Sequence, residues 1–195
     1  MKKFLPIFIL TFVVVIIAAA AFNLIRDRQA ANEPFGGPLN LVTMDGKPFT
    51  EQDLRATPVA LFFGYTHCPD VCPTTLYELD GWLKQLGAEG ENIKAYFVTV
   101  DPERDTQDVL KLYVGNVSDR ITGLTGTPEN IAEAIRSYHI YARKVPDSDG
   151  GYTMDHTASV FLLDKYGHFR STIAYQENAK TALENLKNLP KRSTS

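Results

Sequence analysis

The pattern of apolar and polar residues predicts strands and helices in alternation along the chain. Two nearly continuous apolar runs, residues 57–66 and 93–101, are typical of strands that are buried on both faces of a sheet. Four other segments have the apolar spacing or the capping residues of helices: 74–90, 105–117, 127–140 and 176–189. In the third of these, Thr127 is expected as the N-cap and Pro128 as the first helical residue.

Turn residues complete this pattern. Asp45-Gly46 and Lys165-Tyr166-Gly167 each separate two strand-like stretches, which are therefore expected to form hairpins. The order of elements predicts an α/β fold with a mixed sheet flanked by helices, and a thioredoxin-like arrangement fits it. Both cysteines follow the first buried strand, and open α/β sheets place their sites at the carboxyl ends of strands.

The N-terminal segment is apolar enough to enter a membrane. Residues Phe4 to Ile25 carry no charged side chain, and as a helix they would cross a hydrocarbon core of about 30 Å. We interpret residues 1–28 as one transmembrane anchor, because a cleavable signal peptide, the alternative, usually has a shorter apolar region. Residues 29–37 are then a polar tether and residues 38–195 a single exported domain, on the periplasmic side of the inner membrane if the cell is bacterial.

Charge indicates little about partners beyond one exclusion. The formal net charge is −3, and Lys and Arg are scattered without a long basic run. This distribution argues against nucleic-acid binding. An exported domain lies in a compartment where two cysteines can form a disulfide.

The chain has only two cysteines, Cys68 and Cys72, and each precedes a proline in the segment THCPDVCPTT. We expect Pro73 to be the first helical residue and Cys72 the N-cap, so that the helix dipole favours a thiolate. The pair could be a disulfide, a thiol-exchange pair or half of a metal site. A Cys68–Cys72 disulfide would close a very short loop and constrain the unfolded chain little.

A distant histidine favours the metal site. His156 stands where a loop is expected to lead into a buried strand, from which its side chain can reach the cysteines. Two thiolates and one imidazole form a soft, three-coordinate set suited to Cu(I) and able to accept Cu(II). A structural zinc site needs four ligands, and the chain has no third cysteine. His67, next to Cys68, is expected to support the site from outside the ligand set.

Three motifs, THCPDVCPTTL, VTVDPERDT and DHTASVFLLD, make the chain resemble the Sco/SenC family of membrane-anchored copper proteins. The resemblance implies a thioredoxin-like domain that binds one copper ion, Cu(I) or Cu(II), through Cys68, Cys72 and His156. It also implies that Asp101 matches an aspartate that supports the site. From its position alone, Asp101 is a turn residue at the end of a strand.

The resemblance further implies a copper metallochaperone. Such a protein takes copper from an unidentified donor and delivers it to cytochrome c oxidase subunit II, whose binuclear copper centre it helps to assemble. The alternatives are a thiol–disulfide reductase that keeps the target cysteines reduced, and a redox sensor. Thioredoxin-like reductases usually have two residues between the cysteines and a cis-proline in the facing loop. Here three residues intervene and residues 152–160 contain no proline, which favours a metallochaperone over an enzyme.

Overall fold

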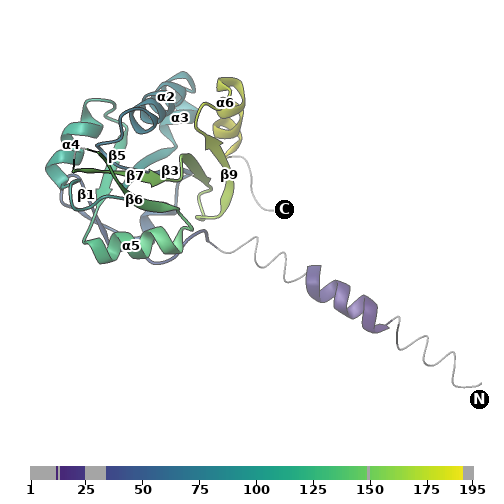
Figure 1. Cartoon of the computed structure of the whole chain (residues 1–195). Coiled ribbons are helices and arrows are strands. Elements are labelled where there is room, and N and C mark those ends of the chain that lie inside the picture. The colour runs from purple at the N-terminus through teal and green to yellow at the C-terminus, as the bar shows by residue number, and fades with distance from the viewer. Residues whose placement is uncertain (1–11, 13, 25–33, 149, 191–195) are drawn as a thin grey trace, which may run out of the picture. The chain divides into compact units, whose positions relative to one another are not determined.

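The computed structural model describes residues 12, 14–24, 34–148 and 150–190 (Figure 1). Contacts along the chain divide it into two units, residues 1–33 and 34–195. In the first unit residues 14–24 are helical, and much of the predicted span from Phe4 to Ile25 lies outside the described residues. Within the part of the chain that the structure describes, no helix combines the length and the apolar character needed to cross a membrane.

The second unit is built around a mixed sheet of seven strands, in the order β2-β1-β5-β4-β3-β8-β9. Strands β3, β4 and β5 are parallel, and every other neighbouring pair is antiparallel. The strands of this sheet are β1 (Leu41–Thr43), β2 (Pro48–Phe49), β3 (Val59–Gly64), β4 (Lys94–Thr99), β5 (Ile121–Thr125), β8 (Ser159–Leu163) and β9 (Phe169–Ala174).

Helices cover both faces of this sheet (Figure 1). In that view α2 (Val71–Gln85), α3 (Ala88–Glu91) and α6 (Ala179–Asn188) lie above the sheet, and α5 (Pro128–Ser137) lies below it. Helix α4 (Gln107–Gly115) packs against β5, and a short 3-10 helix, η1 (Glu51–Leu54), follows β2. This arrangement confirms the mixed α/β fold and fits a thioredoxin-like architecture.

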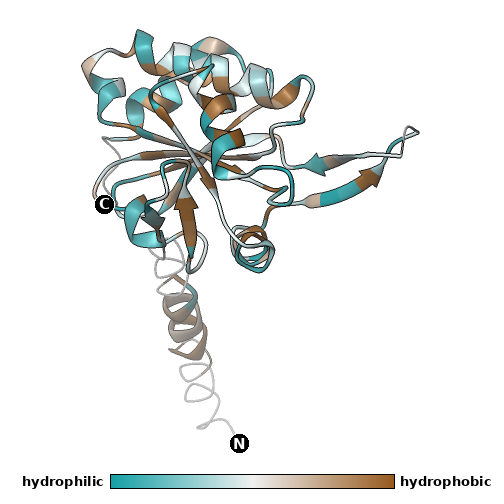
Figure 2. Ribbon diagram, turned by 90° about the vertical axis from the view of Figure 1, so that its left-hand side faces the viewer, coloured by the Kyte–Doolittle hydropathy of each residue, from teal (hydrophilic) through white to brown (hydrophobic). Residues whose placement is uncertain are grey.

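Most of the predicted elements are confirmed. Every residue of β3 is buried between β4 and β8, as its apolar sequence predicts, and hydrophobic residues follow the central strands in Figure 2. The hairpins β1–β2 and β8–β9 form around the predicted turns. Thr127 is the N-cap of α5, where its side chain accepts a hydrogen bond from the backbone N–H of Asn130.

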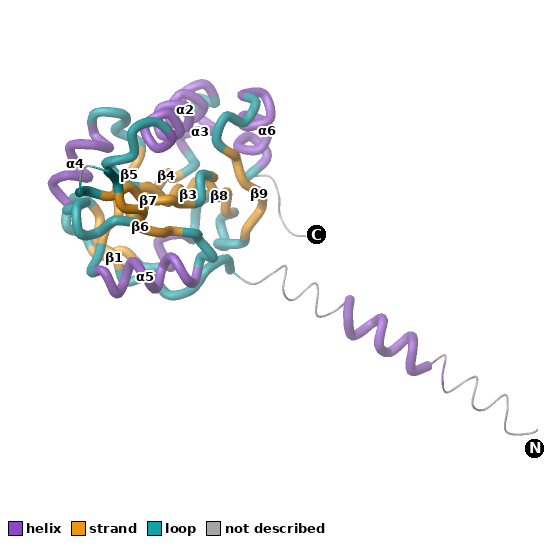
Figure 3. Tube along the Cα trace, in the orientation of Figure 1, coloured by secondary structure: helices purple, strands orange, loops and turns teal. Residues whose placement is uncertain are grey.

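Two parts of the fold differ from the prediction. Strand β5 was not predicted, because its sequence ITGLT is short and contains a glycine and two threonines. The stretch Tyr152–His156, predicted as a loop, is strand β7, which pairs with β6 (Ala142–Pro146) in a separate two-stranded hairpin (Figure 3). Both strands carry charged and exposed residues, so their sequences lack the apolar character of a core strand.

The N-terminal end of the second unit is fixed by an aromatic cluster. The backbone N–H of Phe35 donates to the carbonyl oxygen of Gly167, in the β8–β9 turn, across 2.8 Å. The ring of Phe35 lies within 5.5 Å, centroid to centroid, of the rings of Tyr138, Phe161 and Phe169. The first residues of this unit therefore pack beside the β8–β9 turn.

Candidate metal centre

The cysteine segment connects the carboxyl end of β3 to the start of α2. Helix α2 begins at Val71 with Asp70 as its N-cap, so the prediction that Cys72 is the N-cap is wrong. Pro73 occupies the third helical position, where a missing N–H costs nothing because the first-turn N–H groups have no intrahelical acceptor. Cys72 lies in the first turn of the helix, with its backbone N–H pointing out of the helix end.

That N–H group is satisfied by the other cysteine. The backbone N–H of Cys72 donates to Sγ of Cys68 across 3.3 Å, and both cysteines are free thiols. Cys68 keeps 8% of its surface exposed, whereas Cys72 is fully buried.

The two thiols have opposite acidities. A hydrogen bond with Cys72 lowers the pKa of the Cys68 thiol to about 4, although burial acts in the other direction. The same contact, together with deeper burial, raises the pKa of Cys72. The metal-free pair therefore carries one negative charge, on the more exposed sulfur, Cys68.

His156 ends strand β7 and reaches the sulfurs from the hairpin. Its Nε2 atom lies 3.4 Å from Sγ of Cys72, and its Nδ1 atom lies 3.1 Å from the carbonyl oxygen of Thr157. Because a carbonyl oxygen can only accept, Nδ1 is the donor, which leaves Nε2 as the ring nitrogen that can offer a lone pair to a metal. The ring of Tyr65 meets the imidazole edge to face, with the centroids 5.7 Å apart. The imidazole is thus held in the tautomer that a metal ligand requires.

The structure brings these three predicted residues together. The potential ligand atoms of Cys68, Cys72 and His156 all lie within 4.8 Å of one another. Gly64, at the end of β3, permits this close approach, since a Cβ atom there would stand 2.7 Å from Sγ of Cys72 and 2.6 Å from the Phe97 ring. Two sulfurs and one unprotonated imidazole nitrogen around one point can hold a soft metal ion.

Asp101 has no direct contact with the ligand atoms in the described structure, but it contacts the hairpin that carries His156. Its buried carboxylate accepts a hydrogen bond from the hydroxyl of Tyr152, across 2.9 Å, and pairs with the Arg104 guanidinium. The backbone N–H of Asp101 donates to the hydroxyl of Thr99. Asp101 thus joins the end of β4 to strand β7.

His67 turns toward a different group. Its Nδ1 atom lies 3.1 Å from the hydroxyl of Thr66 and 4.0 Å from the carboxylate of Asp105, and more than half of its side chain is exposed. Asp105 is fully buried, which raises its pKa, and accepts hydrogen bonds from the backbone N–H and hydroxyl of Thr66 and from the hydroxyl of Thr99. Asp105 therefore fixes the start of the cysteine segment. Sequence reasoning missed this role because the sequence indicated residues 105 and 106 only as the beginning of a helix.

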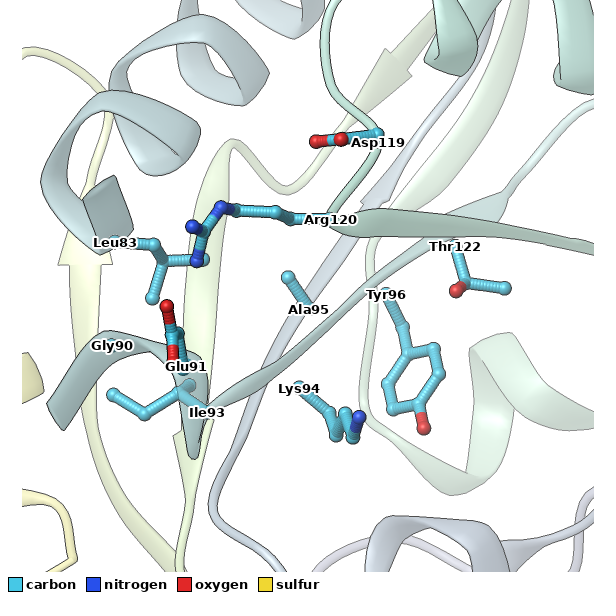
Figure 4. A pocket seen from close by; sticks show the side chains of 10 residues that line it. All are labelled: Leu83, Gly90, Glu91, Ile93, Lys94, Ala95, Tyr96, Asp119, Arg120 and Thr122. Carbon is cyan, nitrogen blue, oxygen red and sulfur yellow. The ribbon is translucent and has the colours of Figure 1, made fainter. Parts of the chain in front are cut away.

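A separate pocket of about 390 Å³ lies elsewhere, near the starts of β4 and β5 (Figure 4). Lys94, Tyr96 and Arg120 line it together with Glu91, but none of the predicted site residues does. The cysteine–histidine cluster is thus independent of this pocket.

Comparison with known proteins identifies the family. Residues 27–191 match the family model described as SCO1/SenC. The chain belongs to the SCO1/SenC family. Among curated SCO proteins, "Protein SCO2, mitochondrial" of Saccharomyces cerevisiae is 36% identical over 166 residues, which cover 83% of this chain and 54% of that protein. The chain spans about half the length of the mitochondrial SCO proteins that it matches.

Solved SCO structures have the same fold. ScoI of Bradyrhizobium japonicum with copper bound is 44% identical, with a TM-score of 0.74, over 80% of this chain and 99% of that chain. Yeast Sco1 with copper bound is 32% identical, with a TM-score of 0.76, over 83% of this chain and 91% of that chain.

Proposed function

We propose that this SCO1/SenC protein is a copper metallochaperone that carries one copper ion on Cys68, Cys72 and His156. The convergence of two sulfurs and the His156 imidazole within 4.8 Å is the observation that carries the proposal. The copper in the solved ScoI and Sco1 structures supports it. The recipient that the family resemblance suggests is cytochrome c oxidase subunit II, with a separate protein as the copper donor.

The acidities of the groups favour the uptake of a copper ion. Cys68 provides a thiolate without losing a proton, because its pKa is already low. Cys72 gives up its proton when the metal binds, so that binding releases one proton at neutral pH. Two thiolates and a neutral imidazole then offer the soft donors that Cu(I) prefers, and the imidazole also suits Cu(II).

Titration of the full chain, purified in detergent, with Cu(I) and Cu(II) tests the proposal. We expect one copper per chain and, for Cu(II), a sulfur-to-copper charge-transfer band. His156→Ala should abolish this band and leave the alkylation of Cys68 unchanged. The matched control is His139→Asn, which changes an exposed histidine at a positive φ angle to a residue that tolerates it. Undiminished copper binding by His156→Ala would contradict the ligand set.

The low pKa of Cys68, and its greater exposure than Cys72, support a second candidate, a thiol–disulfide reductase. In that reaction the Cys68 thiolate attacks a disulfide of the target and forms a mixed disulfide, releasing one target thiolate. Cys72 then loses its proton and attacks Cys68, which leaves a Cys68–Cys72 disulfide and a fully reduced target. Cys72→Ser should trap the mixed disulfide, whereas a metallochaperone without exchange activity would accumulate none. A sensor would form the same internal disulfide with an oxidant in place of the target.

We also propose that residues 1–28 anchor the protein, with Phe4 to Ile25 crossing the membrane, residues 29–37 as tether and residues 38–195 as the extracytoplasmic domain. The absence of charged side chains from Phe4 to Ile25 supports the assignment. Extraction of membranes at alkaline pH should leave the full chain in the pellet and release a chain that lacks residues 1–28. An impermeant thiol reagent should label Cys68 in intact spheroplasts.

A further inference from the structure

The strand that carries His156 is not part of the main sheet. Among the described residues β7 pairs only with β6, and this two-stranded arm extends to the right of the rest of the domain in Figure 2. No ladder of backbone hydrogen bonds therefore fixes the distance between β7 and the cysteine segment. Side chains must set the position of the arm.

Tyr152, at the start of β7, makes the densest set of such contacts. Two cations contact its ring, with the Arg104 guanidinium carbon 3.7 Å and the Lys144 Nζ atom 4.6 Å from the ring centroid. Its hydroxyl donates to Asp101 across 2.9 Å, and its carbonyl oxygen accepts from Nη1 of Arg104 across 3.0 Å. We call this group of four residues the Tyr152 clamp.

The Arg104 guanidinium is itself stabilised by the other residues of the Tyr152 clamp. Its guanidinium pairs with Asp101, but its Nη2 atom is buried without a hydrogen-bond partner. This partly buried cation is stabilised by its paired carboxylate, by the carbonyl oxygen of Tyr152 and by the face of the stacked ring. Removal of Asp101 would leave Arg104 uncompensated, so substitution of Tyr152 is the cleaner way to open the clamp.

The clamp and the histidine lie at the two ends of one strand. Side chains two positions apart point to the same face of a strand, so Tyr152, Met154 and His156 face the domain while Thr153 and Asp155 are exposed. Tyr152 and His156 are four positions apart along the strand, about 13 Å. Fixing Tyr152 therefore fixes the direction from which the imidazole approaches the sulfurs.

We propose that Tyr152, held by Arg104, Lys144 and Asp101, is the positioning residue that places the His156 imidazole against the two sulfurs. This inference rests on the proposed function, since a metal ligand is what needs such placement. It assigns a role to the DPERD segment, which precedes α4: Asp101 and Arg104 hold the arm.

The copper-binding experiment compares variants of the full chain in detergent, with Cu(I) affinity measured by competition with a chromophoric chelator. Tyr152→Leu removes the ring and should weaken Cu(I) binding at least tenfold. Tyr152→Phe removes only the hydrogen bond to Asp101 and should have a smaller effect. The matched control Tyr141→Leu changes an exposed tyrosine next to β6 and should alter the affinity less than twofold.

A double-mutant cycle distinguishes an effect of Tyr152 on the position of His156 from an effect on the fold as a whole. In a His156→Ala background copper is left with the two sulfurs, and Tyr152→Leu should then change the Cu(I) affinity less than twofold. An equal loss in both backgrounds would overturn the proposal, because Tyr152 would then act on the fold rather than through His156.

Metal-free protein provides a test that does not depend on copper. The Tyr65 ring that meets the imidazole should shift the NMR signals of the His156 ring protons through its ring current. Tyr152→Leu should move these shifts toward random-coil values, and Tyr141→Leu should leave them in place. If the wild-type protein bound no copper, the proposed function would be wrong. The chemical shifts of His156 would then be the sole test of whether Tyr152 positions the imidazole. If copper bound through His156 but Tyr152→Leu changed neither affinity nor shifts, only the clamp would be wrong.

Discussion

The backbone N–H of Cys72 donates to Sγ of Cys68 across 3.3 Å, at the first turn of α2. The backbone N–H and the thiol of Cys72 thus both stabilise Cys68 as a thiolate, with the positive end of the helix behind it. The reactive sulfur is Cys68, which has the lower pKa and the greater exposure.

We therefore predict that the rate at which Cys68 reacts with iodoacetamide is independent of pH around neutrality, because the thiol is already fully ionised there. Because its pKa is about 4, the thiolate fraction falls only in acid, whereas an ordinary thiol with a pKa of ~8.5 loses reactivity tenfold per pH unit below that value. The rate of metal-free protein, followed by mass spectrometry against pH, provides the measurement. Cys68→Ser should leave only the slow reaction of Cys72. A midpoint near the ordinary thiol value would contradict the assignment.

Gly64→Ala should both destabilise the domain and disturb the site. The added methyl group would stand less than 3.0 Å from Sγ of Cys72 and the Phe97 ring, and such overpacking costs roughly 1–3 kcal/mol. Urea denaturation measures the loss, and the Cu(II) spectrum reports the displaced sulfur.

Gly81→Ala in the middle of α2 is the matched control. A Cβ atom there has no neighbour within 4 Å, and replacing a helical glycine by alanine gains about 0.5–1 kcal/mol. Equal effects of the two substitutions would contradict the packing argument.

Asp164 is expected to stabilise the β8–β9 turn in a pH-dependent way. Burial alone would raise its pKa, but the backbone N–H groups of His168 and Tyr166 and the Arg170 guanidinium outweigh it, so the pKa lies below 3.8. A lowered folded-state pKa means that the stabilisation is present above 3.8 and is lost as the pH falls through the folded value.

Asp164→Asn should accordingly cost about 1–3 kcal/mol at neutral pH, and the difference from wild type should shrink in acid. Thermal unfolding across pH measures it. The control is Asp155→Asn, which breaks an exposed pair with Arg143 worth at most about 1 kcal/mol. A difference that persisted unchanged below pH 3.8 would exclude the ionised carboxylate as its cause.

The fold could be predicted where the local sequence alone determines an element. The apolar run of β3 and the Thr127-Pro128 start of α5 depend on neighbouring residues, and both are confirmed. Strand β5 owes its structure to pairing with β4 and β1, which are distant in sequence. Strands β6 and β7 pair with each other, but they carry charged and exposed residues and so lack the apolar character by which the core strands were predicted. The start of α2 was misplaced because Pro73 fits the third helical position as well as the first.

The candidate site divides in the same way. The cluster of Cys68, Cys72 and His156 could be predicted, because sulfur and imidazole are uncommon side chains whose chemistry restricts their use. The parts played by Asp105 and Tyr152 could not, because carboxylates and tyrosines occur throughout the chain. Only the contact of Asp105 with Thr66, or of Tyr152 with Arg104, distinguishes them.

The docking of Phe35 onto the β8–β9 turn has a mechanical consequence. Val59, at the start of β3, pairs with Leu163 just before that turn, whereas Gly64, beside the sulfurs, is at the opposite end of the same strand. A load applied through the residues ahead of Pro34 is therefore borne by the aromatic cluster at one pole of the sheet. We therefore expect the sulfur–imidazole geometry at the other pole to change little under such a load, because the length of β3 lies between the two.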